Sequence, residues 1–363
     1  MKIMFFIPSL EGGGAERVAL NLARVAVSNK VEIFVVVAKA GGKLLQDMSK
    51  IATVIDLNKS RVNQCIRPLA KAIDVVEPDA VISFMDHCNI VLLLSKLFTN
   101  YKNFKTIISV HNNLEVNLIK TSRWKGELIK FLVSKLYNRA DSIVCVSQGV
   151  QFSLSKFLKK KTMKKTCVIY NPSLDESIMS KAGEDIELPF VLGEHKLICA
   201  VGRLTKQKGF DLLISAYAAL KNRSLGSRLI ILGEGEEREN LVKLIEELNL
   251  KNEIFLLGFQ DNPYKYISKS DLFVFSSRWE GFGVALVEAL YLKTSVVSFD
   301  CDYGPREILA NGLYGALVPN QDVESLSIAI AKCLKEDKKI ETGDYLRKFT
   351  LNHVFSEYKK LWT

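Results

Sequence analysis

Short apolar runs alternate with longer segments of helical periodicity along the chain. In the first half, the runs are rich in β-branched and aromatic residues and are apolar at successive positions, which is typical of parallel strands covered by helices on both faces. These runs are KIMFFI, VEIFVVV, IATVID, AVISF, TIISV, SIVCVS and CVIY. The pattern predicts an α/β domain built on a doubly wound parallel sheet.

A polar segment interrupts this alternation. Residues 171–195 (NPSLDESIMSKAGEDIELPFVLGEH) contain two prolines and two glycines and predict a linker. After it, the runs KLICAVG, RLIILG, EIFLLG, DLFVFSS, SVVSF and GALV predict a second parallel sheet. We therefore expect Rossmann-like domains at 1–172 and 190–345, followed by a segment, 346–363, whose amphipathic helix can pack back on the first domain.

The length of 363 residues agrees with two domains of ordinary size, each able to bury a substantial core. Two doubly wound sheets that face each other would form a cleft lined by the loops at the carboxyl ends of their strands. Ligands of open α/β folds bind at such positions. Functional residues are therefore expected directly after strands.

Charge is distributed unevenly. Residues 1–180 carry 26 Lys and Arg against 14 Asp and Glu, whereas the remainder carries 24 against 26. Twelve basic residues lie between 120 and 165, and all except Lys120 fall in the segments SRWKGELIKFLVSKLYNR and SKFLKKKTMKK. Basic amphipathic segments are typical of an anionic membrane surface, and a solvated helix face is the alternative. Nucleic acid is not expected as a partner, because no nucleic-acid-reading motif accompanies the charge.

The cysteines and the apolar runs limit the class of protein. The seven cysteines are scattered, without a CxxC or a Cys/His cluster, and predict reduced core residues in the cytoplasm and no structural zinc site. The run MKIMFFIPSL is too short to span a bilayer and has no signal cleavage pattern, and NIVLLLSKLF is interrupted by Lys96. No transmembrane helix is expected.

The segment RWEGFGVALVEAL (278–290) places two carboxylates among apolar residues. Glu280 is expected at the carboxyl end of a strand, just before a helix whose first N–H groups, from residues 281–285, form an anion site. Glu288 is expected to be buried in that helix, where sugar or ribose hydroxyls would supply donors. The alternative is a partly exposed Glu288, or one paired with Arg278.

Two cations and a glycine-rich loop are further candidates. AVGRLTKQKGFDLLI places Arg203 directly after a strand and Lys208 at the start of the next helix. Two fixed cations beside a helix N-terminus suit a departing diphosphate, and two solvated loop residues are the alternative. The glycines of PSLEGGGAERVAL permit close approach of a ligand, but they are consecutive and so depart from the dinucleotide fingerprint.

Polar residues also follow two strands of the first domain. His111, with the asparagines at 112–113, follows TIISV and can contact a hydroxylated ligand. Asp86 and Asn89 follow AVISF, where turn chemistry or core hydrogen bonding is the alternative. The acidic pattern at Asp300–Asp302 is a minor candidate for a metal site, and no metal is expected.

In combination, these segments resemble a known family. EGFGVALVE is similar to the E-x7-E signature of family 4 retaining glycosyltransferases with the GT-B architecture. GGGAERVALNLA, SVHNN, VGRLTKQKGFDLLI and GPREI resemble the accompanying motifs in the same order. The resemblance covers nearly the whole chain, and it is closest to bacterial enzymes that assemble lipid-linked oligosaccharides, O-antigens or capsules.

The resemblance implies roles for individual residues. As catalytic residues, Glu280 would contact the transferred sugar with His111 nearby, while Arg203 and Lys208 would bind the donor diphosphate. The implied donor site consists of Gly13, Gly14, Arg203, Lys208, Phe259 beside the base, Glu280, Gly281, Phe282, Gly283, Val284, and Glu288 on the ribose hydroxyls. The expected acceptor or membrane surface consists of Asp86, Asn89, Lys159, Lys160 and Lys161.

The implied reaction is transfer of a hexose or N-acetylhexosamine, with retention, from a UDP-linked or other nucleotide sugar to a polyprenyl-linked or other glycan acceptor. It would serve bacterial surface polysaccharide synthesis, such as that of the lipopolysaccharide O-antigen. The enzyme would act without a metal or other cofactor, peripherally on the anionic inner face of the cytoplasmic membrane. Two alternatives remain: a GT-B-fold nucleotide-sugar epimerase, and a non-catalytic module that binds anionic lipid or glycan.

Overall fold

The computed structural model describes residues 1–111, 114–115, 123–191, 195–221, 226–336 and 340–363. The chain divides into two compact units: unit 1 is Met1–Ser173 with Lys348–Thr363, and unit 2 is Leu174–Arg347. Unit 2 begins within the predicted linker, because helix α9 (Ser177–Ala182) packs on α12 (Tyr264–Ser268) of the same unit.

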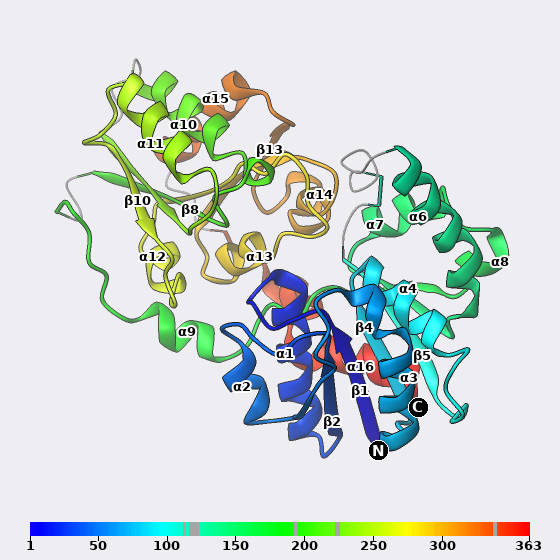
Figure 1. Cartoon of the computed structure of the whole chain (residues 1–363). Coiled ribbons are helices and arrows are strands. Elements are labelled where there is room, and N and C mark those ends of the chain that lie inside the picture. The colour runs from blue at the N-terminus through cyan, green and yellow to red at the C-terminus, as the bar shows by residue number, and fades with distance from the viewer. Residues whose placement is uncertain (112–113, 116–122, 192–194, 222–225, 337–339) are drawn as a thin grey trace. The chain divides into compact units, whose positions relative to one another are not determined.

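Unit 1 is built on a seven-stranded sheet with the order β3-β2-β1-β4-β5-β6-β7, in which all neighbours are parallel. Figure 1 labels β1, β2, β4 and β5 of this sheet. Its strands are β1 (Lys2–Ile7), β2 (Glu32–Val37), β3 (Thr53–Asp56), β4 (Ala80–Phe84), β5 (Lys105–Val110), β6 (Ser142–Cys145) and β7 (Thr166–Val168). Its helices are α1 (Gly14–Ser28), α2 (Leu45–Ser49), η1 (Val62–Cys65), α3 (Ile66–Val76), α4 (Asp86–Ser95), α6 (Arg123–Leu136), η2 (Tyr137–Arg139), α7 (Gln148–Ser155), α8 (Lys160–Met163) and α16 (Leu351–Trp362).

Unit 2 is built on a six-stranded parallel sheet with the order β10-β9-β8-β11-β12-β13. Its strands are β8 (Lys196–Val201), β9 (Ser227–Leu232), β10 (Ile254–Gly258), β11 (Leu272–Phe275), β12 (Ser295–Asp300) and β13 (Ala316–Pro319). Its other helices are η3 (Lys206–Lys208), α10 (Phe210–Lys221), α11 (Arg238–Glu247), α13 (Val284–Tyr291), α14 (Pro305–Ile308), η4 (Ala310–Gly312), α15 (Val323–Glu336) and η5 (Gly343–Phe349), the last of which ends in unit 1.

The thirteen apolar runs in the sequence correspond to the thirteen strands found among the described residues, so the predicted pair of doubly wound parallel sheets is confirmed. The runs lack a polar face because helices cover both sides of each sheet. In β1, for example, residues 3–7 are completely buried.

Helix α16 completes unit 1 although it follows all of unit 2 in the sequence. It packs on α1 (Figure 1). Its residues Val354, Phe355, Tyr358 and Trp362 belong to the same apolar cluster as residues of β1 and β2. The side chain of Thr350 caps the helix by accepting from the backbone N–H of His353. Unit 1 is therefore closed by a distant segment of the chain.

Each sheet has one point at which the direction of winding reverses. This switch point lies between β1 and β4 in unit 1, and between β8 and β11 in unit 2. Ligands of doubly wound sheets bind outside the carboxyl ends of the strands at this point. The loops after these four strands are therefore the expected ligand-binding positions, each within its own unit.

Candidate active site

The switch point of unit 2 brings a buried carboxylate and a cation together. Glu280, in the loop after β11, is only 8% exposed, and its Oε1 lies 2.5 Å from Nζ of Lys208, in the loop after β8. Ser277 Oγ donates to the same Oε1 at 2.7 Å, and Gln207 Nε2 donates to Oε2 at 3.3 Å. The buried charge is thus paired and hydrogen-bonded, which offsets the cost of removing it from water.

The side chain of Lys208 crosses the end of β8. A Cβ on Gly202 would lie 3.2 Å from Lys208 Cγ and Cδ, and Nζ lies 5.5 Å from the centre of the Phe275 ring. An ammonium group has three donors, so the contact with Glu280 leaves two N–H groups for a ligand. Lys208 can therefore hold the carboxylate and an anion at the same time.

Arg203 follows β8 directly, as predicted, but does not join the cluster around Glu280. It is exposed, and it forms no ion pair with any residue that the structure describes. Its guanidinium can therefore turn toward an anion at the carboxyl ends of β8 and β11 without first breaking a protein contact.

Arg278 fastens the loop after β11 to the loop after β8. Its guanidinium donates to Asp211 at 2.8 and 2.6 Å and to the carbonyl of Lys206 at 2.9 Å. Burial disfavours ionisation of Asp211, but the hydrogen bonds and charge of Arg278 outweigh it and lower the pKa of that carboxyl. The alternative in which Arg278 pairs with Glu288 is therefore wrong.

Two glycines allow the loops to approach this closely. Gly209 has φ +62°, and a Cβ there would lie 2.2 Å from the carbonyl oxygen of Ser276. A Cβ on Gly233, after β9, would lie 1.9 Å from the carbonyl oxygen of Gly202. A larger residue at Gly209 would push the loop of Lys208 away from that of Glu280, and one at Gly233 would push the loops after β8 and β9 apart.

Glu288 lies on α13 and is 8% exposed, so its predicted burial is confirmed. Tyr264, at the start of α12, donates its hydroxyl to Glu288 Oε1 at 3.2 Å. Phe259 follows β10 and is 43% exposed. Phe282, in contrast, packs its side chain into the core, so only its backbone can face a ligand.

In the acidic pattern at Asp300–Asp302, the first aspartate is paired with a basic residue of the protein. Asp300, at the end of β12, forms an ion pair with Arg306 of α14. Among the residues that the structure describes, no group of three or more His, Cys, Asp or Glu side chains is arranged to hold a metal ion.

In unit 1, the glycine-rich loop after β1 folds around a carboxylate. Glu16 is buried, and its Oε2 accepts from the backbone N–H groups of Gly12 at 2.8 Å and Gly13 at 2.5 Å. These two groups therefore face Glu16. Gly14 begins helix α1, and a Cβ on either Gly12 or Gly14 would meet nothing within 4 Å, so there is open space beside both residues.

The end of β4 differs from the expectation. Asp86 begins α4 and accepts from the hydroxyl of Tyr137 at 3.3 Å. Asn89 is fully buried: its Oδ1 accepts from Ser83 Oγ at 2.7 Å, and its Nδ2 donates to the carbonyl of Ser109 at 2.9 Å. Asn89 therefore lies in the interior and not on the surface to which the sequence assigned it, because core hydrogen bonding fixes it.

His111 follows β5, one strand away from the switch point of unit 1. Its Nε2 lies 3.0 Å from Ser109 Oγ, and its ring centre lies 5.7 Å from that of Phe84. Burial lowers the pKa of His111 to about 4, so the ring is neutral at neutral pH. The neighbouring asparagines at 112–113 lie outside the described residues.

The basic region of unit 1 carries exposed apolar side chains. Trp124, Leu128 and Phe131 follow one another at helical spacing along α6, and all three are exposed, as is Phe152 on α7. The predicted lysines, 159–161, are exposed at the start of α8, which contacts η2 at the end of α6. No helix that the structure describes is long and apolar enough to cross a bilayer.

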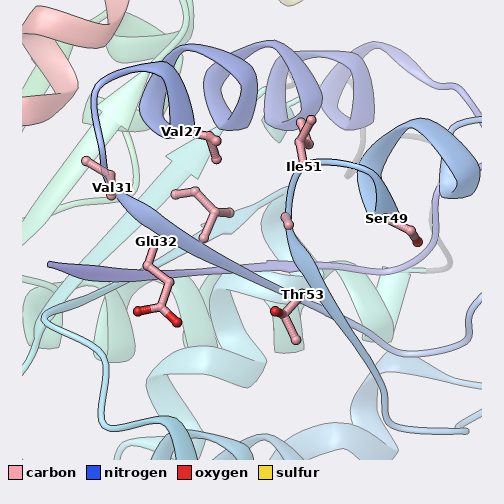
Figure 2. Close-up of a pocket in the computed structure, with 8 residues that line it drawn as sticks. Val27, Val31, Glu32, Ser49, Ile51 and Thr53 are labelled. Atoms are coloured by element: carbon pink, nitrogen blue, oxygen red, sulfur yellow. The ribbon is translucent and has the colours of Figure 1, made fainter.

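A pocket elsewhere in unit 1 lies away from these residues. It is lined by Val27, Val31, Glu32, Ile33, Ser49, Ile51, Ala52 and Thr53 (Figure 2). These residues surround the amino ends of β2 and β3, at the opposite edge of the sheet from the carboxyl-end loops. None of the predicted site residues lines it.

Three side chains that hydrogen-bond to Glu280 or Glu288 were not predicted from the sequence. Ser277 and Gln207 lie within the segments that carry Glu280 and Lys208, and their position after strands was a usable signal. Tyr264 gave no local signal, because it lies 24 residues before Glu288 on another helix.

Comparison with known proteins identifies related sequences and structures. The family model "Glycosyltransferase Family 4" matches residues 12–172, and "Glycosyl transferases group 1" matches residues 186–349. The chain is 33% identical, over 93% of its own length and 91% of the relative's, to N-acetylgalactosamine-N,N'-diacetylbacillosaminyl-diphospho-undecaprenol 4-alpha-N-acetylgalactosaminyltransferase of Campylobacter jejuni. A second transferase of that organism, which adds alpha-1,4-N-acetyl-D-galactosamine to a diphospho-undecaprenol-linked glycan, is 25% identical over 99% of this chain and 98% of its own.

Solved structures share the fold at lower identity. Sucrose-phosphate synthase of Thermosynechococcus elongatus has a TM-score of 0.80 at 17% identity, covering 100% of this chain and 98% of that one. HepE of Anabaena in complex with UDP-glucose has a TM-score of 0.79 at 19% identity, covering 99% and 98%.

Proposed function

Because this chain belongs to the glycosyltransferases of group 1 and family 4, we propose that it moves a hexose or N-acetylhexosamine from a nucleotide sugar to a polyprenyl-linked glycan, with retention. The acceptor is proposed from the two Campylobacter jejuni relatives, whose names specify diphospho-undecaprenol-linked substrates. UDP is the proposed nucleotide, since HepE binds UDP-glucose.

The observation that carries the proposal is the contact between Lys208 and Glu280 at the switch point of unit 2. A departing nucleoside diphosphate develops negative charge, which a fixed ammonium group stabilises without reorganisation. The two remaining N–H groups of Lys208 and the exposed guanidinium of Arg203 supply this charge. A metal ion is not required in this scheme.

Glu280 is proposed to orient the transferred sugar. A carboxylate has about four acceptor positions. Lys208, Ser277 and Gln207 occupy three of them, which leaves one for a sugar hydroxyl. In the reaction, the bond between the anomeric carbon and the phosphate oxygen breaks, the acceptor oxygen bonds to that carbon from the same face, and a phosphate oxygen takes the acceptor proton.

A donor and acceptor screen tests this function. The purified protein is incubated with UDP-, GDP- and ADP-linked hexoses and N-acetylhexosamines and a synthetic polyprenyl-diphosphate glycan, with and without EDTA. We expect acceptor-dependent release of UDP, a product heavier by one sugar residue, an alpha linkage by NMR, and no loss of rate with EDTA. Sugar conversion without acceptor would instead identify an epimerase, and glycan or vesicle binding without nucleotide release would identify a non-catalytic module.

Glu288→Gln tests the proposed nucleoside contact. We expect it to weaken UDP binding about 10- to 30-fold, because a hydrogen bond from a ribose hydroxyl to a charged acceptor contributes about 1.5–2 kcal/mol. Isothermal titration with UDP measures this directly. Glu239→Gln, the same change on the exposed face of α11, serves as the matched control. Equal affinities for all three proteins would remove Glu288 from the donor site.

We also propose that unit 1 binds an anionic membrane surface. The exposed apolar residues of α6 are accompanied by cations: Lys125 Nζ lies 5.5 Å from the centre of the Trp124 ring, and Lys135 Nζ lies 5.9 Å from that of Phe131. Rings of this kind enter the headgroup region while the ammonium groups face lipid phosphates. This surface would place the protein peripherally on the cytoplasmic face of the membrane, where polyprenyl-linked acceptors are embedded.

Replacing lysines 159–161 by glutamine tests the electrostatic part. Each lysine near an anionic surface contributes about 1 kcal/mol at most, so binding to phosphatidylglycerol vesicles is expected to fall about 10- to 100-fold at low salt. The difference should shrink as salt rises. Vesicle co-sedimentation measures it, with Lys243, Lys332 and Lys335 of unit 2 replaced together as the charge-matched control. Binding that falls equally in both triple variants would contradict a role for this surface.

A further inference from the structure

A line of hydrogen bonds connects His111 to the helix that closes unit 1. His111 Nε2 lies 3.0 Å from Ser109 Oγ, and Ser109 Oγ lies 3.3 Å from the hydroxyl of Tyr358 on α16. Ser109 and Tyr358 have 0% and 1% of their surface exposed, so water cannot substitute for either contact. The C-terminal helix is thus connected to His111, a candidate site residue of unit 1.

Which group donates in each hydrogen bond follows from the partners that each hydroxyl group has. A phenol has one proton, and Ser109 Oγ is the only hydrogen-bond partner of the Tyr358 hydroxyl within the described residues. Burial raises the pKa of Tyr358, which keeps that proton in place, and a buried donor without an acceptor is costly. Tyr358 therefore donates to Ser109.

Ser109 then has one proton to give. Its hydroxyl oxygen accepts from Tyr358, and its remaining neighbour is Nε2 of His111, so Ser109 donates to that nitrogen. The ring of His111 is neutral because burial lowers its pKa to about 4. A neutral imidazole whose Nε2 accepts must carry its proton on Nδ1.

The surroundings hold this arrangement in place. Asn89 Nδ2 donates to the carbonyl of Ser109 at 2.9 Å, which fixes the end of β5 from α4. Phe84 contacts one face of the histidine ring, with 5.7 Å between ring centres. Ser109 is therefore held from two sides, by α4 and by α16. Rotation of the imidazole would break its own contacts with Ser109 and Phe84.

We propose that Tyr358 and Ser109 are positioning residues that fix His111 as the neutral Nδ1–H tautomer, so that it presents an N–H donor to a substrate hydroxyl at the carboxyl end of β5. The tautomer follows from the hydrogen-bond geometry and from the burial of His111 and Tyr358, while the role at the substrate rests on the proposed transferase function. A donor held in one tautomer requires no proton rearrangement when the substrate binds. The segment after unit 2 would thereby take part in the reaction and not only in the stability of unit 1.

Histidine NMR tests the tautomer without any substrate. The chain has only four histidines, so the ¹⁵N signals of His111 can be assigned by their loss in His111→Gln. We expect protonated Nδ1 and unprotonated Nε2 in the unaltered protein, and a mixture of both tautomers in Tyr358→Phe and Ser109→Ala. Tyr217→Phe is the matched control, because it removes a buried hydroxyl that donates to Ser227 in unit 2.

Kinetics and binding complete the test. If His111 is mispositioned, kcat should fall about three- to tenfold in Tyr358→Phe while the affinity for UDP is unchanged, with Tyr217→Phe at the rate of the unaltered protein. Thermal unfolding is recorded for each variant, and Tyr358→Phe removes only one oxygen and keeps the packed ring. An Nε2-protonated His111, or the same tautomer in all variants, would overturn the inference. The expected NMR result in a protein without transferase activity would instead contradict the proposed function alone.

Discussion

Lys208→Met is expected to lower kcat/KM for the sugar donor about 10²- to 10³-fold, because removal of one fixed charge at a developing anion costs about 2.7–4 kcal/mol. Methionine keeps the apolar stem that lies over Gly202 and removes only the ammonium group. Steady-state nucleotide release with a saturating acceptor measures the loss. It should appear mainly in kcat, since the charge on the phosphate grows as the bond to the sugar breaks.

Two controls separate this effect from a damaged fold. Lys206→Met makes the same change two residues earlier, on an exposed side chain, and should retain nearly full activity. Lys208→Met also leaves Glu280 without its cation, so the double variant with Glu280→Gln is needed to show whether the two losses are coupled. Activity within threefold of normal in Lys208→Met would exclude the proposed diphosphate contact.

Trp362→Ala is expected to destabilise unit 1 by about 3–5 kcal/mol, which is the usual cost of removing a buried aromatic side chain. Trp362 is 3% exposed, and its ring lies 5.9 Å from that of Phe355 and 6.2 Å from that of Tyr358. Because typical domains have only about 5–15 kcal/mol of stability, this loss should separate the unfolding of unit 1 from that of unit 2. Calorimetry should then show two transitions, with the lower one assigned to unit 1 by hydrogen exchange.

Trp362→Phe is the informative comparison. The indole Nε1 of Trp362 is buried without a hydrogen-bond partner among the described residues, so phenylalanine loses part of the packing but also removes an unsatisfied donor. We expect a change of about 1 kcal/mol or less. A loss as large as that of the alanine variant would show that the indole nitrogen has a partner, and that packing is not the main contribution of this residue.

The fold was accessible from the sequence because parallel strands carry a strong local signal. Strands inside each sheet are runs of apolar residues buried on both faces, as in AVISF of β4, and segments with helical periodicity separate the runs. The predicted linker contains a short helix, α9. Its polar composition conceals α9, whose contacts with α12 depend on residues about eighty positions away, such as Asn262, which donates to the carbonyl of Lys181.

The candidate site was predictable where its charged side chains lie in the loops directly after strands. Lys208 and Glu280 follow β8 and β11, which are adjacent in the sheet, so their contact follows from the topology. Asn89 shows the limit of this reasoning. It follows β4 as Asp86 does, but it lies three residues further along the helix, where the side chain turns inward to Ser83 and Ser109.

The contacts of α16 with the rest of unit 1 could not be predicted from local sequence, because they join residues that are far apart in the chain. The amphipathic pattern of FSEYKKLWT predicts a helix with one buried face, but it does not single out Tyr358 as the residue that meets Ser109, 249 positions earlier. The glycine-rich segment PSLEGGGAERVAL likewise does not predict that Glu16 accepts from the N–H groups of Gly12 and Gly13, because the same loop is equally compatible with a bound anion.

The return of α16 to unit 1 also affects how the protein is made. A ribosome completes residues 174–347 before it adds the helix that covers α1, so the nascent first unit emerges with part of its apolar surface open while the second unit is already able to fold. The usual order, in which the N-terminal part finishes first, is thereby reversed. During that interval of translation, the uncovered apolar surface of unit 1 is accessible to holdase chaperones or to lipid.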